Sequence, residues 1–209
     1  MYIKNRRNIA KLKAFGSYQT MFLFENMVLR SRHFSYTLTV VSHIEKTLKH
    51  IVDLEKITLR KATIVEKSIA VDIDYELDKI EHVELRREEK ITKAILNDEC
   101  FFILENNQVV GFVIFDYRFF DQGWIELIII KEDYRGKGIG AKVFDLICAK
   151  CKSDKVFTST NHSNNRMQRA LEKAEFSFAG EIKGLDEGDP ELFYFKKLDK
   201  SNIDRSKMK

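Results

Sequence analysis

The chain has few cysteines, and no apolar run in it approaches the length of a membrane span. Its three cysteines are too few, and odd in number, for a disulfide framework, so we expect a reducing, cytoplasmic setting. A membrane-spanning helix needs about 20 consecutive apolar residues, and none of the runs is that long. The apolar part of the N-terminus is interrupted by Gln19, Glu25 and Asn26. This pattern does not fit an export signal.

The chain also has little net charge, and its basic excess is confined to one end. Residues 1–56 contain ten Lys/Arg and four Asp/Glu, a net charge of +6, whereas residues 57–209 contain 26 and 28, a net charge of −2. The basic segment is therefore either a solvated extension or an arm that contacts nucleic acid or another anionic surface. The near-neutral remainder gives no reason to expect nucleic acid or a membrane as its partner.

From residue 57 onward, the hydrophobic periodicity becomes regular and predicts one mixed α/β domain. Thr63 and Glu66 have the spacing of a capping box that opens a helix. A second helix is expected from about 77 to 96. The remaining patterns predict strands near 57–62, 100–105, 108–119, 124–131, 155–160, 176–182 and 191–198, and helices from about 139 and over 164–175. We thus expect an extension at 1–56 with a helix near its end, a domain at 57–198 and a charged tail at 199–209.

Glycine is scarce as well, yet three of the nine glycines lie within the stretch YRGKGIG, residues 134–140. A buried strand precedes this stretch and a helix follows it, which is an arrangement that binds phosphate groups through backbone N–H donors. A nucleoside triphosphate loop is excluded because Lys137 is followed by Gly138. A dinucleotide fingerprint is excluded because the third glycine comes one residue early. The pattern [RQ]-x-x-G-x-[GA] remains, met by Arg135, Gly138 and Gly140.

With its flanking strand and helix, WIELIIIKEDYRGKGIGAKVFDLI resembles the acetyl-CoA-binding motif of the GNAT acetyltransferase superfamily. The segment NNRMQRALEKAEFSFAGEI is similar to the second signature of that family, although Glu175 stands where a glycine usually precedes Phe176. The resemblance covers roughly residues 57–198. It implies an α/β fold with a mostly antiparallel central sheet, splayed between its central strands and flanked by helices.

The resemblance further implies that acetyl-CoA is the cosubstrate and that no metal is needed. The main chain of Ile128, Ile129 and Ile130 would pair with the pantetheine arm. Beside Arg135, the backbone N–H groups that would hold the pyrophosphate belong to Gly136, Lys137, Gly138, Ile139, Gly140 and Ala141.

One asparagine near residue 164 would bind the pantetheine arm. Asn164 matches the second signature, and Asn161 and Asn165 are alternatives. Asn164 or Ser163 is equally well suited to cap the helix that begins there.

Acetyl transfer to an amine needs a base for the amine proton and a hydrogen-bond donor for the oxyanion. We expect Glu126 to be the base, because it is the one carboxylate in the apolar stretch WIELIIIK and desolvation would make it more basic. The resemblance also implies a bulge in this strand, and a backbone N–H at the bulge, near Leu127 and Ile128, would be the donor. The usual tyrosine acid of the family is replaced by Leu171, and Tyr194 is either a substitute or a core residue. A thiolate with a pKa near about 8.5 can leave without an acid.

The sequence predicts an N-acetyltransferase that uses direct attack on the thioester of acetyl-CoA, with a small amine or a protein amino group as acceptor. A non-catalytic acyl-CoA-binding regulatory module is the alternative, favoured by Leu171. Cys148 and Cys151 have no second metal-ligand pair at suitable spacing. The acidic loop 185–191 is either solvated or steers a cationic acceptor. A homodimer stays open.

Overall fold

The computed structural model describes residues 43–44, 46–49, 54, 56–75 and 84–199. The chain divides into two compact units, residues 1–52 and residues 53–209, and the site lies in the second. Residues 43–44 and 46–49 are helical, as predicted for the end of the extension. The rest of the extension up to residue 53, the predicted helical segment 77–83 and the tail from residue 200 lie outside the described residues. Within the described ranges, no helix has the length and apolar character that crossing a bilayer requires.

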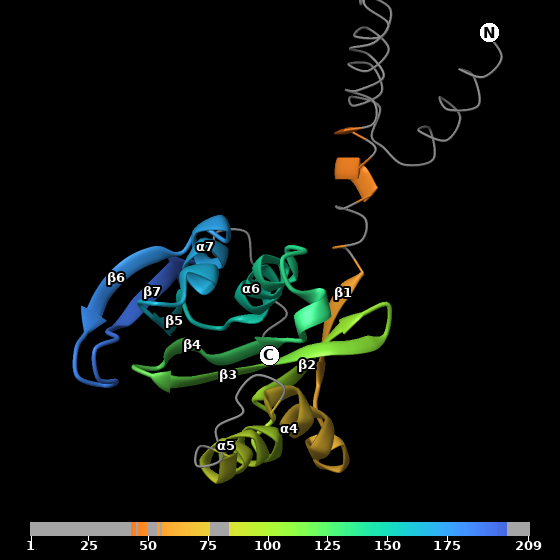
Figure 1. Ribbon diagram of the computed structural model, residues 1–209, viewed down its shortest axis with the longest axis horizontal. Coiled ribbons are helices and arrows are strands. Elements are labelled where there is room, and N and C mark those ends of the chain that lie inside the picture. Colours follow the sequence, from red (N-terminus) through yellow and green to blue (C-terminus); the bar gives the residue numbers. More distant parts are fainter. Residues whose placement is uncertain (1–42, 45, 50–53, 55, 76–83, 200–209) are drawn as a thin grey trace, which may run out of the picture. The chain divides into compact units, whose positions relative to one another are not determined.

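Seven strands form one sheet in the order β1-β2-β3-β4-β5-β7-β6 (Figure 1). All neighbouring strands are antiparallel except β4 and β5, which are parallel. This confirms the predicted mostly antiparallel α/β fold. The strands are β1 (Ile57–Lys61), β2 (Cys100–Glu105), β3 (Gln108–Phe119), β4 (Gln122–Ile130), β5 (Lys155–Asn161), β6 (Ser177–Ile182) and β7 (Glu191–Lys197).

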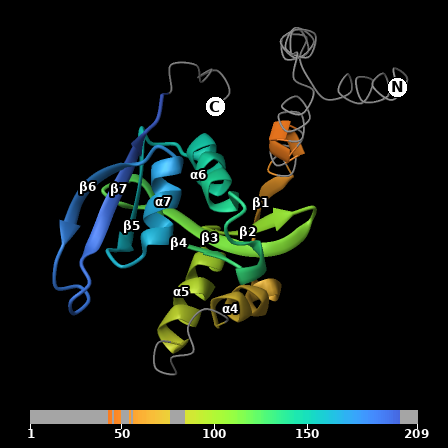
Figure 2. The same cartoon turned by 45° about the horizontal axis from the view of Figure 1, so that its top comes forward.

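Helices cover both faces of the sheet (Figures 1 and 2). The pair α4 (Lys67–Tyr75) and α5 (Glu84–Leu96) packs on one face, and the pair α6 (Ile139–Lys150) and α7 (Asn165–Lys173) packs on the other. Two 3-10 turns, η1 (Ile64–Glu66) and η2 (Glu132–Tyr134), precede α4 and α6. The expected inner stripe of α5, Ile91, Ala94 and Ile95, is buried against the sheet.

The predicted capping box opens η1. The Glu66 carboxylate accepts hydrogen bonds from the backbone N–H of Thr63 at 3.3 Å and from its Oγ1 at 2.6 Å. The Arg60 guanidinium donates to the same carboxylate at 2.8 and 3.0 Å. Chiefly because of the hydrogen bonds from Arg60 and Thr63, the pKa of Glu66 falls to about 2. The Glu66 carboxylate therefore forms the capping box and the ion pair with Arg60 at the same time.

The two turns that connect β2, β3 and β4 agree with those predicted from the sequence, except that the second lies one residue earlier. Asn106 and Asn107 both have positive φ, 50° and 66°, as expected for a tight turn between β2 and β3. The next turn lies at Phe120 and Asp121, with φ of 51° and 57°, rather than at 121–123. It is displaced because Gln122 already pairs with Phe119.

Strand β4 carries a β-bulge at Glu126. Ile114 pairs with Leu127 but Phe115 pairs with Ile125, so Glu126 is the extra residue on β4. Strands β4 and β5 pair only at Gly123–Ile125 and Val156–Thr158. Beyond Ile125 they diverge, which confirms the expected splay between the central strands.

Candidate active site

The glycine turn has a backbone that only glycine adopts easily. Gly136 and Gly138 have φ of +75° and +83°, in the left-handed region where a Cβ is disfavoured. Gly138 is also the N-cap of α6, so no side chain caps this helix. The first turn of α6 contains no acidic residue. Its free N–H groups and the positive end of the helix dipole therefore stay available for an anion.

Gly140 differs from the other two glycines of the turn. It is the second residue of α6, and a Cβ there would lie 3.7 Å from Ile130 Cδ1, an ordinary contact. This explains physically why the pattern at this position accepts alanine as well as glycine.

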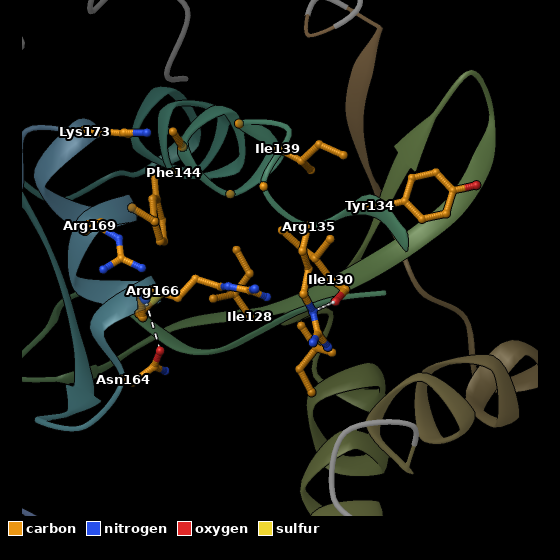
Figure 3. A pocket seen from close by; sticks show the side chains of 17 residues that line it. Ile128, Ile130, Tyr134, Arg135, Ile139, Phe144, Asn164, Arg166, Arg169 and Lys173 are labelled. Carbon is orange, nitrogen blue, oxygen red and sulfur yellow. Dashed lines mark hydrogen bonds between the residues drawn. The ribbon is translucent and has the colours of Figure 1, made fainter. Parts of the chain in front are cut away.

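The turn faces a cavity of about 630 Å³ between β4, α6 and α7 (Figure 3). Its walls bring together almost every residue that the sequence proposes for cofactor binding. Those lining it are Ile128, Ile129, Ile130, Arg135, Gly136, Gly138, Ile139, Gly140, Ala141 and Asn164. The sequence segments 128–130, 135–136, 138–141 and residue 164 thus line one cavity.

Lys137 is the exception among the proposed residues, because it does not line the cavity. Its side chain is exposed, and Nζ lies 4.9 Å from the centroid of the Tyr134 ring. Only its backbone N–H remains a candidate for cofactor binding.

Arg135 holds the turn in place. Its Nε donates a hydrogen bond to the carbonyl oxygen of Ile130 at 2.7 Å, visible as a dashed line in Figure 3. This bond ties the turn to the end of β4. Arg135 therefore orders the turn as well as adding positive charge to the cavity wall.

Three further cations on α7 were not proposed from the sequence. Arg166, Arg169 and Lys173 line the cavity opposite the turn. Their spacing of three and four residues places them on one face of a helix, a signal that could have identified them. No acidic side chain belongs to the described cavity lining. The cavity therefore suits a polyanion.

Of the three asparagines considered, only Asn164 lines the cavity. Its Oδ1 caps α7 by accepting from the backbone N–H of Met167 at 3.1 Å, which leaves Nδ2 to donate to a ligand. Asn161 Nδ2 donates to Asp186 at 2.8 Å, and Asn165 Nδ2 donates to the Ser163 carbonyl at 3.1 Å. Capping and ligand contact are therefore compatible at Asn164.

Glu126 does not line the cavity. Its carboxylate contacts Lys90 Nζ of α5 at 3.0 Å and the Arg118 guanidinium at 3.1 Å, and its side chain is 22% exposed. The bulge thus places it on the α5 face, beside the divergence of β4 and β5. The expected half-buried carboxylate is present, but two cations share it, which the sequence did not indicate.

The network around Glu126 is anchored by a buried carboxylate. Asp116, 3% exposed, accepts from the backbone N–H of Arg118 at 2.7 Å and from its Nε at 3.0 Å. The hydrogen bond to Asp116 raises the pKa of Arg118. These bonds hold the guanidinium beside Glu126.

The other candidate groups belong to the core. Leu171 is fully buried and Tyr194 is 6% exposed, and neither lines the cavity. Burial raises the pKa of Tyr194, and it raises the pKa of Cys148 to about 11. Among the described residues, no cluster of three His, Cys, Asp or Glu side chains is arranged to hold a metal ion.

Comparison with known proteins agrees with this arrangement. A model of the acetyltransferase (GNAT) family matches residues 67–176. The crystal structure of a GNAT family acetyltransferase from Bacillus cereus is 30% identical, covers 68% of this chain and 97% of its own, and has a TM-score of 0.62. No curated protein matches this chain.

Two more distant structures share the fold. One is yncA from Salmonella typhimurium with its cofactor acetyl-CoA, which is 16% identical over 70% of this chain and 96% of its own, with a TM-score of 0.54. The other is an acetyl transferase from Salmonella typhimurium that modifies the N-terminal serine of a 50S ribosomal subunit protein; it is 12% identical over 69% of this chain and 96% of its own, with a TM-score of 0.57.

The family model spans more than half of the chain, and the Bacillus cereus protein matches over two thirds of it. Both findings agree with the glycine turn, the bulged β4 and the capped α7 described above. The resemblance inferred from the sequence is therefore confirmed, and the chain belongs to the GNAT family of acetyltransferases.

Proposed function

We propose that the chain transfers an acetyl group from acetyl-CoA to an amine nitrogen. The observation that carries this proposal is the cavity between β4, α6 and α7, which is lined by the part of β4 that no longer pairs with β5. It offers the main chain of a half-paired strand, a glycine turn at a helix N-terminus and a capping asparagine on one surface. We assign the catalytic domain to residues 57–198 and a cytoplasmic location to the protein.

The cavity residues fit acetyl-CoA, which supplies the acetyl thioester when bound. The first turn of α6 and the turn before it would hold the pyrophosphate through N–H donors. Ile128, Ile129 and Ile130 would pair with the pantetheine amides through main-chain groups that β5 leaves unpaired. Asn164 Nδ2 would donate to the same arm. The cations of α7 would neutralise the remaining phosphate charge.

The chemistry proceeds by direct attack. The amine nitrogen of the acceptor bonds to the acetyl carbon, the carbon–sulfur bond breaks, and the amine proton passes to Glu126 directly or through water. The backbone N–H of Leu127 or Ile128, beside the bulge, donates to the developing oxyanion. An acetyl-cysteine intermediate is disfavoured because Cys148, with its pKa raised to about 11, stays a thiol near neutral pH and lies outside the cavity lining.

The test is a thiol-release assay with acetyl-CoA and a panel of small amines, polyamines, lysine peptides and free peptide N-termini. Gly138→Asp places a side chain at positive φ and a negative charge in the phosphate site. Gly184→Asp is the matched control, because Gly184 also has a positive φ, +84°, and open space around it. We expect turnover by the wild type and by the control, and none by Gly138→Asp. The proposal would be disproved if the wild-type protein did not bind acetyl-CoA.

A non-catalytic acyl-CoA-binding module is the second candidate. It is favoured by Leu171, which is fully buried where the family usually has a tyrosine acid. It predicts acetyl-CoA binding without thiol release for every acceptor, and no change in that binding in Glu126→Gln.

The basic extension at residues 1–56 gives a separate hypothesis. If it contacts an anionic partner, the binding of that partner should weaken at high salt and disappear when residues 1–56 are removed.

A further inference from the structure

Five aromatic side chains gather on the sheet face opposite α6 and α7. We call them the aromatic cluster: Phe119, Trp124, Phe157, Phe193 and Phe195. The Phe119 ring stacks on Trp124 with centroids 4.8 Å apart and contacts Phe157 at 5.2 Å. Each of the five is half-buried, and none belongs to either of the two hydrophobic cores. A contiguous apolar cluster that solvent still reaches and that no core absorbs is a feature of binding sites.

The strand register fixes the face on which the cluster lies. Phe157 pairs with Phe195, and Ser159 pairs with Phe193, so these side chains share one face. Their neighbours Val156 and Tyr194 are buried in the core formed with α6 and α7, and alternation places the cluster on the other side. On that side, α4 and α5 pack against β2 and β3, away from β6 and β7 (Figures 1 and 2).

The cluster borders the place where the reaction must occur. Trp124 precedes the bulge residue Glu126 by two positions, about 7 Å along a strand. Its partner on β5 is Phe157, one pair before the last pair between the two strands. The α6–α7 side of that point is the cavity assigned to acetyl-CoA. An acceptor nitrogen therefore approaches from the opposite face, across the aromatic cluster.

Negative charge lies beside the end of β5, next to this face. The loop between β6 and β7 contains Asp186 and Asp189, and it is tied to the end of β5. Asn161 Nδ2 donates to Asp186 at 2.8 Å, and Ser163 donates to Asp189 from its backbone N–H at 2.9 Å and its Oγ at 2.6 Å. Glu191 pairs directly with Asn161. The face thus combines an apolar surface with carboxylates that attract an ammonium group.

We propose that the aromatic cluster binds the first side chain of a polypeptide, so that the acceptor is the α-amine of a peptide or protein beginning with a large apolar residue. This inference rests on the proposed function. An α-amine is attached to the same carbon as its side chain, so a side chain on Trp124 and Phe193 leaves the amine beside the bulge. A lysine amine lies at the end of a long flexible chain and has no such constraint.

The charge state of the acceptor favours the same class. The α-amino group has an ordinary pKa of about 7.7–8.0, whereas the lysine amine has one of about 10.4. Glu126 shares its carboxylate between Lys90 and Arg118. An amine that loses its proton near neutral pH needs less from that base.

The test compares kcat/KM for peptides that differ only in their first residue: Phe, Leu, Ser and Gly. A fifth peptide has a blocked N-terminus and one lysine. We expect the Phe and Leu peptides to exceed the Ser and Gly peptides by about tenfold or more, the range that an apolar pocket supplies. The blocked lysine peptide should show the lowest rate. Equal rates for all first residues, or a preference for lysine, would overturn the inference.

Two variants locate the preference. Phe193→Ala should lose most of the discrimination between first residues while keeping its affinity for acetyl-CoA. Phe178→Ala is the control, since Phe178 lies on β6, is 57% exposed and contacts Tyr194 on the other side of the sheet. Retained discrimination in Phe193→Ala would overturn the inference. If that variant loses acetyl-CoA binding through misfolding, the wild-type peptide comparison still decides.

Two other results would also overturn it. A wild-type dimer that becomes monomeric in Phe193→Ala, measured by light scattering, would assign the cluster to a second copy of the chain. Absence of thiol release with every acceptor would overturn this inference and the proposed function together, whereas release without a first-residue preference would overturn this inference alone.

Discussion

Glu126 is the residue whose chemistry is most directly testable, because it lies at the bulge and outside the cofactor cavity. Replacing it with glutamine keeps its shape but removes its ability to accept a proton. We expect Glu126→Gln to lower kcat about 10²-fold, the lower end for general-base catalysis, with little change in the affinity for acetyl-CoA. Steady-state thiol-release assays measure kcat, and isothermal titration calorimetry measures the affinity for acetyl-CoA.

The control for that substitution is Glu99→Gln. Glu99 also contacts the Arg118 guanidinium, at 3.4 Å, but it does not lie at the bulge. If both variants lose activity equally, the charge network around Arg118 matters and the base assignment is wrong.

The glycines of the turn provide a pair of substitutions with opposite effects. Gly138→Ala forces alanine into φ of +83°, which should lower the free energy of unfolding by about 1–2 kcal/mol. Gly140→Ala meets only an ordinary contact inside a helix and should raise it by about 0.5–1 kcal/mol. Urea denaturation measures both changes. Equal destabilisation would show that the turn is not strained as described.

The cavity-lining residues that the sequence proposed belong to local patterns. The glycine turn and Asn164 depend on the order of neighbouring residues, so a motif locates them. The partners of Glu126 could not be predicted, because Lys90 lies on α5 and Arg118 lies on β3, both distant from Glu126 in the sequence. Only the folded chain brings these charges together.

At the scale of the element, α7 combines a cap, a core stripe and a cationic face. Removing one cavity cation should weaken acetyl-CoA binding. We expect Arg169→Gln to raise the Kd by about threefold to tenfold, as for one partly exposed charge-assisted contact, and the loss should shrink at high salt.

Lys150→Gln is the matched control for Arg169→Gln, since Lys150 is exposed on α6 and outside the cavity lining. Both variants change the net charge equally. An equal effect on acetyl-CoA binding would mean that the net charge of the protein determines the affinity, and that the cationic face of α7 has no specific role.

The start of η1 and α4 should depend on pH through Glu66. Its pKa is about 2 in the folded protein, against an ordinary value of 4.5. A lowered pKa means that the stabilisation is complete above pH 4.5 and is lost as the pH falls toward 2. Glu66→Gln should therefore lower Tm near pH 7 and have little effect on Tm near pH 2.

Thermal denaturation of wild type and Glu66→Gln across that range checks this prediction. Glu89→Gln, an exposed site on α5, is the control. A Tm difference between wild type and Glu66→Gln that does not change with pH would rule out the carboxylate as its source.

Element types and bounds were largely predictable, because alternation and helical periodicity follow each segment's own burial. The order of β5, β7 and β6 was not. It depends on long-range pairing. The resemblance implied a bulge near Leu127 and Ile128, and the pairing with β3 places it at Glu126. The shifted turn at Phe120 and Asp121 has the same origin, because the pairing of Phe119 with Gln122 determines where the chain reverses.

For the whole molecule, the sheet divides the catalytic unit into two chemical sides. The α6–α7 side has a cationic cavity suited to acetyl-CoA, and the α4–α5 side has Glu126 and the aromatic cluster. The bulge and the divergence of β4 from β5 lie between these sides. Acetyl transfer at this position of the sheet is the central claim.

The most direct test of that claim is the mass of the acceptor after incubation with acetyl-CoA and the protein. We predict that an acceptor peptide with a free N-terminus gains one acetyl group with wild-type protein and with Gly184→Asp, but not with Gly138→Asp. An acceptor panel that stays unmodified while the wild type binds acetyl-CoA would contradict the claim and support a binding module.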